Sequence, residues 1–332
     1  MIIKVPVRYN FLVGLLTLFI HGSLAQTVPL DTNSNVTKQI DASLISQHKW
    51  IHGAVDCENS TDPGLEVFRF SDSSYIIRQN KCLSYEAPFI YLLFGEDRAL
   101  ILDTGTTDNT VDFPLFSTVE SLMRDRAAHV GKKTSELIVI HSHSHSDHYA
   151  GDSQFVGKEN VTVIKPNSQA VQQYFSLDQW PQGEASIELG DRELIVIPTP
   201  GHQEEAISVY DPQTKWLLTG DTFYPGYLVI KHWDEYKNSI ARLVSFSKNH
   251  EVSAVLGAHV EMTNQAGKFY PIGTIYQPNE AALALGPENL ITLNSAIKDS
   301  DGPTFIILDK FVVAPMNRFQ KTLSNFARWI TQ

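Results

Sequence analysis

The chain carries three histidines and one aspartate within six residues, His143, His145, Asp147 and His148, directly after the apolar run 137–140. The neutral imidazole ring is the commonest side-chain metal ligand near neutral pH. Three protonated imidazoles so close together would repel one another, and an uncompensated polar cluster beside a buried strand would be costly. A bound cation removes both costs, so this segment predicts a metal site.

Four further polar residues share one position relative to the apolar runs. Each follows shortly after such a run: Asp103 after 99–102, His202 after 194–197, Asp221 after 215–218 and His259 after 252–256. Loops at the ends of strands are where a rigid scaffold brings side chains together. We therefore expect these residues to converge with the histidine cluster on one site.

The apolar pattern around these residues predicts alternating strands and helices. Besides the runs already named, strands are expected around Val67, around 75–77 and over 89–94, 161–164 and 206–210. The polar turns at 95–98 and 211–214 predict hairpins. Helices are expected over 113–129, 168–175 and 234–248. A run of strands with helices, followed by a second such run, suits two packed β-sheets with helices outside.

The ordered set of motifs resembles that of the metallo-β-lactamase superfamily. The family pattern is an aspartate after the early strands, His-x-His-x-Asp-His, a later histidine, a later aspartate and a final histidine, and all five occur here within residues 65–260. The resemblance implies an α/β (α+β) fold, an αββα four-layer sandwich with its site at one edge. It places this domain at residues 61–275, with a C-terminal extension, 276–332, packed on the same domain.

In that family the ligands are divided between two zinc ions. By resemblance, the first ion is held by His143, His145 and His202, the second by Asp147, His148 and His259, and both by Asp221. Asp147 would also orient the attacking water or take its proton. Asp103 would hold a ligand imidazole by a hydrogen bond, the alternative being a strand-end turn residue. His141 is expected to be a strand-end histidine and not a ligand.

The complete ligand set implies a secreted dizinc hydrolase in which a metal-bound hydroxide attacks a small ester, lactone, β-lactam-like amide or thioester. Asp221 is closer to the glyoxalase, lactonase and phosphodiesterase branches, because β-lactamases of the family often have a cysteine there. A phosphodiesterase of the same fold and a non-catalytic metal-binding protein remain alternatives. Tyr224 and Tyr227 follow Asp221, and they either line a substrate pocket or belong to a packed surface loop.

The first 25 residues have the pattern of a secretory signal peptide. Lys4 and Arg8 precede an apolar stretch, 11–20, and a small-x-small site lies before Gln26. A membrane anchor is the alternative, but the apolar stretch falls short of the ~20 residues that span a bilayer. Cleavage would give an extracellular protein, or a periplasmic one in a bacterium, with residues 26–60 as an N-terminal extension.

The charge balance and the cysteines limit the partners and the compartment. The formal net charge is −11, and removal of the two basic residues of the leader gives 24 − 37 = −13. This balance disfavours nucleic acid and anionic membranes as general partners and leaves a small-molecule substrate. Cys57 and Cys82 are expected to pair in an oxidising compartment, two free buried thiols being the alternative. Three sequons would be glycosylated only in a eukaryote: Asn35, Asn59 and Asn160.

Overall fold

The computed structural model describes residues 42–331, with side chains described up to residue 325. The expected signal peptide and the Asn35 sequon lie outside the described residues. The described part belongs to one unit, residues 40–332, whose internal contacts form a single cluster.

Six strands form the first sheet. They are β1 (Leu65–Ser71), β2 (Ser74–Gln79), β3 (Phe89–Phe94), β4 (Arg98–Leu102), β5 (Glu136–Ile140) and β6 (Val161–Val163), in that spatial order. The first four strands are antiparallel, and β4, β5 and β6 run parallel. Leu102 of β4 pairs with Ile140 of β5. The two strands therefore end together, and Asp103 leaves the sheet beside the histidine cluster.

A second sheet of five strands lies against the first. Its spatial order is β12 (Ala254–Gly257), β10 (Trp216–Gly220), β9 (Ile207–Asp211), β8 (Glu193–Pro198) and β7 (Ala185–Glu188). β10 and β12 run parallel, with Leu218 beside Leu256, while the other pairs are antiparallel. A small third sheet joins β11 (Tyr227–Ile230), β14 (Val312–Pro315) and β13 (Ile306–Ile307).

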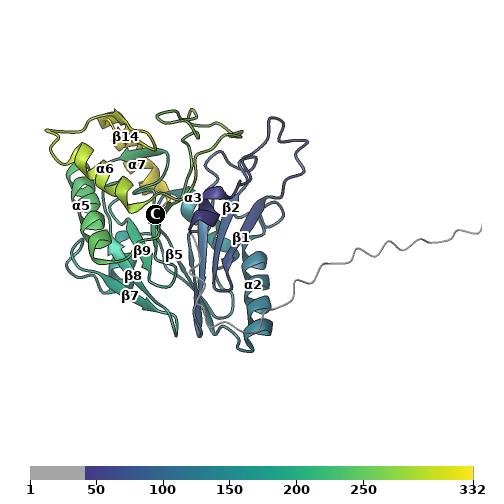
Figure 1. The fold of residues 1–332 in the computed structure, drawn as a ribbon. Coiled ribbons are helices and arrows are strands. Elements are labelled where there is room, and N and C mark those ends of the chain that lie inside the picture. Colours follow the sequence, from purple (N-terminus) through teal and green to yellow (C-terminus); the bar gives the residue numbers. More distant parts are fainter. Residues whose placement is uncertain (1–41, 332) are drawn as a thin grey trace, which may run out of the picture. The chain divides into compact units, whose positions relative to one another are not determined.

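The helices cover the outer faces of the two main sheets (Figure 1). Buried apolar side chains of both sheets, such as Leu100 and Trp216, form one core between them. The helix α2 (Leu115–Val130) packs on the outer face of the first sheet, while α5 (Trp233–Asn249) and α6 (Pro287–Ile297) cover the second. These layers confirm the expected αββα sandwich.

Further helices complete the fold. They are α1 (Ser43–Gln47), α3 (Ser146–Tyr149), the 3₁₀ turn η1 (Ala150–Gln154), α4 (Ser168–Phe175) and α7 (Arg318–Thr331). Of these, α1 and α4 contribute buried side chains to the core between the sheets. Among the described residues, no helix is long and apolar enough to cross a membrane.

The expected helix over 113–129 begins two residues later than its apolar pattern indicates. Phe113 is fully buried but precedes Pro114, and α2 begins at Leu115. A residue before proline is disfavoured in the helical conformation, because the proline ring clashes with its backbone. The helix ends at Gly131, whose φ of 75° and N–H bond to the Ala127 carbonyl form a left-handed cap.

The segment that precedes β1 packs into the inter-sheet core. Ile45 and Trp50 are buried there, and Cys57 forms a disulfide with Cys82 across a sequence separation of 25 residues. This bridge ties the segment to the loop between β2 and β3.

Removal of the disulfide by the double substitution Cys57→Ser and Cys82→Ser is expected to lower the free energy of unfolding by about 3 kcal/mol. The bridge restricts the unfolded chain, and a loop of this length gives an entropy of that size. Urea denaturation of both proteins without reductant measures the loss. Excess reductant should bring the wild type to the midpoint of the variant, and equal midpoints before reduction would contradict the prediction.

Candidate metal centre

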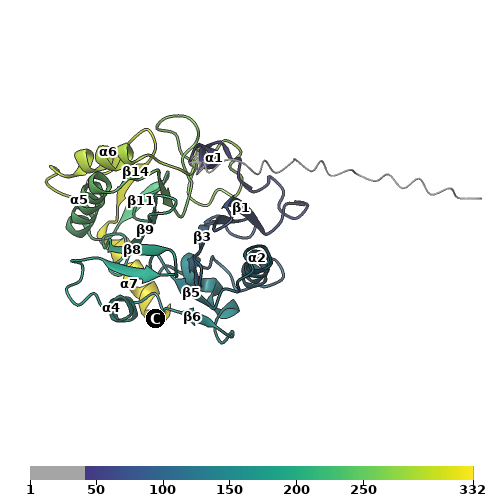
Figure 2. The same cartoon turned by 60° about the horizontal axis from the view of Figure 1, so that its bottom comes forward.

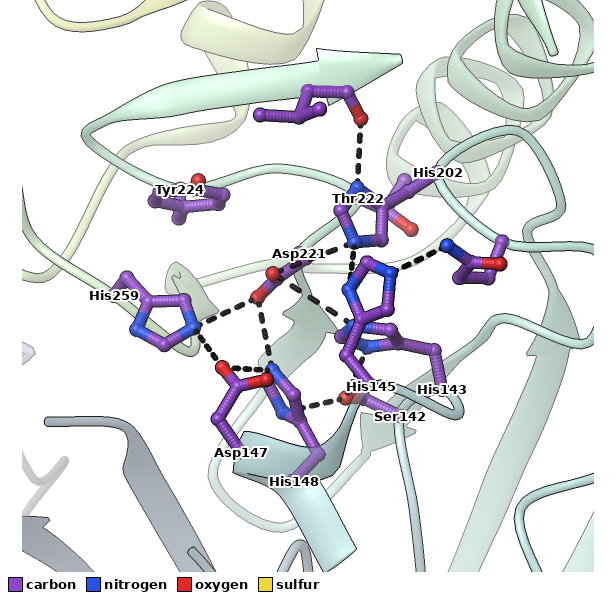
Figure 3. A network of polar contacts seen from close by, with 12 residues as sticks. Ser142, His143, His145, Asp147, His148, His202, Asp221, Thr222, Tyr224 and His259 are labelled. Carbon is purple, nitrogen blue, oxygen red and sulfur yellow. Dashed lines mark hydrogen bonds and ion pairs between the residues drawn. The ribbon is translucent and has the colours of Figure 1, made fainter. Parts of the chain in front are cut away.

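Seven side chains converge where four strands of the two main sheets end (Figure 3). The segment after β5 supplies His143, His145, Asp147 and His148, and the loops after β8, β10 and β12 supply His202, Asp221 and His259. The distant runs of the chain therefore meet as their shared strand-end positions predict. The side chains form two groups, within each of which the potential ligand atoms lie within 4.8 Å of one another.

The first group joins three imidazoles and one carboxylate. Nδ1 of His145 lies 3.0 Å from Nε2 of His202. Oδ2 of Asp221 lies 3.5 Å from Nε2 of His202 and 3.8 Å from Nε2 of His143. Two ligands of a tetrahedral zinc ion with bonds of about 2.0–2.1 Å are ~3.3 Å apart, so these separations fit one such ion.

The second group contains Asp147, His148 and His259. Oδ2 of Asp147 lies 3.1 Å from Nε2 of His148 and 3.3 Å from Nε2 of His259. The other oxygen of Asp221, Oδ1, lies 3.5 Å and 3.3 Å from the same two nitrogens. Asp221 therefore turns one oxygen toward each group, as a carboxylate that bridges two ions must do.

Several atoms at the centre are buried with no hydrogen-bond partner among the described residues: Nε2 of His143, His148 and His259, and Oδ1 of Asp221. A buried polar group without a partner costs free energy, and four at one point would be an unusual concentration. Cations at the two positions satisfy all four atoms at once. The donor set of nitrogen and carboxylate oxygen suits zinc and similar divalent metals, so the residues fit a dinuclear metal site.

In each ligand imidazole, the ring nitrogen that points away from the metal positions also has a polar contact. Hydrogen bonds of this kind fix the tautomer and the orientation of a ligand ring. The Nδ1 partners are Ser142 Oγ for His143 (3.1 Å), Asp103 Oδ2 for His148 (2.8 Å), Val229 O for His202 (2.7 Å) and Glu86 O for His259 (2.9 Å). In these four rings Nε2 is thus the atom that faces the metals. His145 is reversed: Nδ1 faces the centre, and Nε2 contacts the amide of Gln203.

Asp103 and His141 have different surroundings. Besides His148, Asp103 accepts hydrogen bonds from the backbone N–H and hydroxyl of Ser142, and its backbone adopts a left-handed φ of 71°. His141 contacts the carbonyl of Ile164 and the carboxylate of Asp152 and belongs to neither ligand group. Asp103 thus orients a ligand ring, whereas His141 joins strand-end loops.

Burial and the close packing of charges set the protonation of the ligands. Burial lowers the pKa of His145 to about 3, with a further contribution from His202, and also holds the pKa of His143 well below 6.5. Burial alone would raise the pKa of Asp221, but the imidazoles of His259, His148 and His143 outweigh it and hold that pKa well below 3.8. Burial alone would also lower the pKa of His148 and His259, but the nearby carboxylates, Asp147 and Asp221 among them, outweigh it and hold both pKa values well above 6.5. Metals bind neutral imidazoles and ionised carboxylates, so a metal bound by the second group would displace a proton from each of these two rings.

Glycines allow two ligands to approach the centre. Gly201, before His202, has a φ of 143°, and a Cβ there would lie 2.5 Å from Cα of Tyr236. Gly220, before Asp221, has a φ of 50°, and its Cβ would lie 2.4 Å from Cβ of Ser142. Only glycine fits both the conformation and the space.

The substitution Gly201→Ala is expected to weaken zinc binding by at least about tenfold. The added Cβ would clash with the backbone of α5 and displace His202. Loss of the contacts that position a metal ligand lowers metal affinity by about 10–100-fold. Chelator competition measures the affinity. Gly183→Ala is the matched control, since Gly183 also has a positive φ, 86°, but a Cβ there meets nothing within 4 Å. Equal affinities in the two variants would contradict the prediction.

Of the two tyrosines that follow Asp221, Tyr224 lies beside a ligand ring, and its hydroxyl is already engaged. The Tyr224 ring lies 5.5 Å from that of His259, but its hydroxyl donates to the carbonyl of Tyr227. The Tyr227 ring packs against Phe269 at 5.0 Å. Tyr224 therefore forms part of the wall of the centre, and its hydroxyl is not free to donate to a substrate. The sequons Asn59 and Asn160 are both exposed.

Several residues that support the centre were not predicted from the sequence. Gln203 and Glu205 follow His202: Gln203 contacts His145, and Glu205 accepts a hydrogen bond from the backbone of Ser144 at 3.0 Å. Lys231, after β11, is buried and reaches Gln203. Gln203 and Glu205 are marked in the sequence only by their closeness to His202, and Lys231 lies ten residues after Asp221 with no motif around it. None of these positions reveals where the side chain points.

Comparison with known proteins decides the family. The sequence profile of the metallo-beta-lactamase superfamily matches residues 86–252 of this 332-residue chain. The chain belongs to the metallo-beta-lactamase superfamily. With its two ligand groups, it is a metal-dependent hydrolase of the metallo-β-lactamase fold.

Curated superfamily members similar to this chain include two kinds of hydrolase. Acyl-coenzyme A thioesterase MBLAC2 of Bos taurus is 27% identical over 249 residues, which are 60% of this chain and 87% of the relative, and the Homo sapiens protein of that name is 26% identical over the same coverage. Hydroxyacylglutathione hydrolase of Brucella ovis is 30% identical over 115 residues, 35% of this chain and 42% of that protein.

Solved superfamily structures match the chain at lower identity. A metallo-beta-lactamase from Pontibacter korlensis is 16% identical, with a TM-score of 0.46, over 71% of this chain and 100% of that one. The metallo-beta-lactamase DIM-1 is also 16% identical, with a TM-score of 0.44, over 70% of this chain and 98% of that one.

Proposed function

We propose that this metallo-hydrolase holds two zinc ions and hydrolyses acyl thioesters. The observation that carries the two-metal mechanism is Asp221, which turns one oxygen toward each ligand group at separations of 3.3–3.8 Å. The thioester is supported by the relatives, whose names describe removal of an acyl group from coenzyme A or from glutathione.

The surroundings of the centre also suit a thiol leaving group. A thiol has a pKa of about 8.5, so a thiolate leaves without prior protonation, whereas an amide nitrogen must receive a proton before it can leave. The nearest phenol among the described residues that follow Asp221, Tyr224, already donates its hydroxyl to the Tyr227 carbonyl. Tyr224 is therefore not free to protonate an amide nitrogen, whereas a thioester does not need such an acid.

Residues of the chain would orient the attacking water and transfer its proton. Two zinc ions, when bound, lower the pKa of a coordinated water and polarise the substrate carbonyl. Asp147 is the more exposed of the two carboxylates, 18% against 9% for Asp221. Asp147 is thus placed to orient the attacking water and to take its proton, which passes to the departing thiolate as the C–S bond breaks. Oδ2 of Asp147 lies beside Nε2 of His148 and of His259, the two imidazole atoms that face the same metal position.

A hydrolase panel with metal analysis tests the proposal. The purified chain is given acyl-coenzyme A, an acyl-glutathione, a lactone, a β-lactam and bis(p-nitrophenyl) phosphate, each with and without chelator. We expect about two zinc ions per chain and chelator-sensitive release of free thiol. Turnover of the phosphodiester alone would overturn the thioesterase assignment, and thiol release that survives complete metal removal would overturn the mechanism.

We also propose that the chain is exported and acts on a small molecule outside the cytoplasm. The Cys57–Cys82 disulfide supports an oxidising compartment, since such bridges are rare where thiols are kept reduced. N-terminal sequencing of the protein recovered from the medium of a secreting host tests this. A mature chain that begins at Gln26 is expected, and an uncleaved chain retained in the cytosol would contradict it.

A further inference from the structure

Gln203 is an unusually constrained neighbour of the metal centre. Its side chain is 1% exposed and lies between a ligand, a buried lysine and the C-terminal helix. Its amide nitrogen is 2.5 Å from Nε2 of His145 and 3.4 Å from Oγ of Ser324 in α7, and its amide oxygen accepts a hydrogen bond from Nζ of Lys231 at 3.3 Å. Figure 2 shows α7, in yellow, running from near β14 toward α4.

The reversed ring of His145 determines what this amide must do. Because Nδ1 of His145 faces the first ligand group, a metal bound there takes the lone pair of Nδ1, and the ring proton moves to Nε2. The atom next to Nε2 must then accept a hydrogen bond. Of the two ends of a glutamine amide, only the oxygen can accept. With a metal bound, the Gln203 amide must therefore turn over from the orientation in the structure, which exchanges two ends of equal shape and gives up the hydrogen bond from Lys231.

We propose that Gln203 is a positioning residue for the metal ligand His145, with its amide oxygen accepting the hydrogen bond from Nε2–H. The other four ligand rings are held in this way through Nδ1 by Ser142, Asp103, Val229 and Glu86. Gln203 supplies the fifth such contact. It does not touch the metal and acts only through the ring of His145.

Because Lys231 lies beside Gln203, a carboxylate and a thioether at position 203 are expected to have opposite effects. With the oxygen of Gln203 turned to His145, its amino group faces Nζ of Lys231, which places two donors together. Lys231 keeps both oxygens of Glu204, at 3.0 Å and 3.2 Å. A carboxylate at position 203 would accept from both His145 and Lys231, whereas a thioether of similar size would accept from neither with useful strength.

Zinc affinity of three variants tests the role. Chelator competition on the metal-free protein is expected to show 10–100-fold weaker binding for Gln203→Met, the range found when such outer contacts are removed. Gln203→Glu should bind zinc at least as tightly as the wild type. The matched control, Gln154→Met, removes a buried glutamine that binds the Phe113 carbonyl away from the centre, and should leave zinc affinity unchanged.

The melting temperatures of the metal-free proteins separate misfolding from a local effect. If metal-free Gln203→Met has the same melting temperature as the control variant but binds zinc more weakly, the positioning role is supported. Wild-type affinity in Gln203→Met, or equal weakening in Gln203→Glu and Gln203→Met, would overturn it, and a wild type that binds no zinc would overturn the metal site itself. No substrate enters these measurements, so their outcome does not depend on the thioester proposal.

Discussion

Replacement of Asp221 by asparagine is expected to reduce the zinc content from two ions per chain toward one and to lower kcat for thioester hydrolysis by about three orders of magnitude. The carboxylate is the only described side chain that turns an oxygen to both ligand groups. An amide offers one oxygen and one nitrogen that does not bind metal. The loss of several kcal/mol of transition-state stabilisation corresponds to about this change in rate.

Metal analysis of the purified variant and steady-state kinetics with an acyl thioester measure the two effects. Asp299→Asn is the control, because the Asp299 side chain is 85% exposed on the surface and lies in neither ligand group. Two tightly bound zinc ions and wild-type kcat in Asp221→Asn would show that this residue does not bridge the metals.

The substitution Arg192→Met is expected to lower the free energy of unfolding by about 3–5 kcal/mol, because it leaves a buried carboxylate without its partner. Arg192 and Asp211 are fully buried, and the guanidinium donates to both oxygens of Asp211. It also donates to the carbonyls of Ser73 and Phe94. One side chain thus ties the first sheet to the second.

Urea denaturation at pH 7 measures this loss. Two further variants serve as a control and as a rescue. Arg69→Met removes an exposed ion pair with Asp72, whose side chains are 59% and 60% exposed, and should cost less than about 1 kcal/mol. Arg192→Met combined with Asp211→Leu should recover part of the stability, since an apolar pair carries no unpaired charge. If Arg192→Met alone were as stable as the wild type, the role given to Arg192 would be refuted.

The same pair gives a pH dependence. Burial alone would raise the pKa of Asp211, but the Arg192 guanidinium outweighs it and holds that pKa below its ordinary 3.8. A folded-state pKa below the unfolded value means that the contribution is complete above pH 3.8 and is lost as the pH falls further. In Arg192→Met the burial that raises the pKa of Asp211 is no longer outweighed by a guanidinium, so the buried carboxyl takes up a proton at a higher pH than in the wild type. The difference in urea midpoint between the wild type and Arg192→Met is therefore expected to be largest at pH 7 and to shrink as the pH falls.

Much of the fold and of the site could be predicted because the signals are local. The runs 89–94 and 137–140 show their strand character in their own composition, and the helix over 168–175 has the predicted bounds. The third sheet was not predicted. Its parallel pair joins β11 to β14 across more than eighty residues, and β13 is only two residues long. No local pattern marks such a pairing.

Asp211 shows most clearly what the sequence alone leaves undecided. In the pattern it is a turn residue before Pro212, and in the structure it is also the buried partner of Arg192. The order and spacing of the histidines and aspartates determined that this chain has a metal site, because four of the ligands follow one strand together and each of the other three follows a strand of its own. The supporting contacts of Gln203, Lys231 and the Tyr224 hydroxyl were decided only by the tertiary structure. Their partners come from distant strands or from a loop geometry that residue type does not encode, and the direction of a side chain is set by packing.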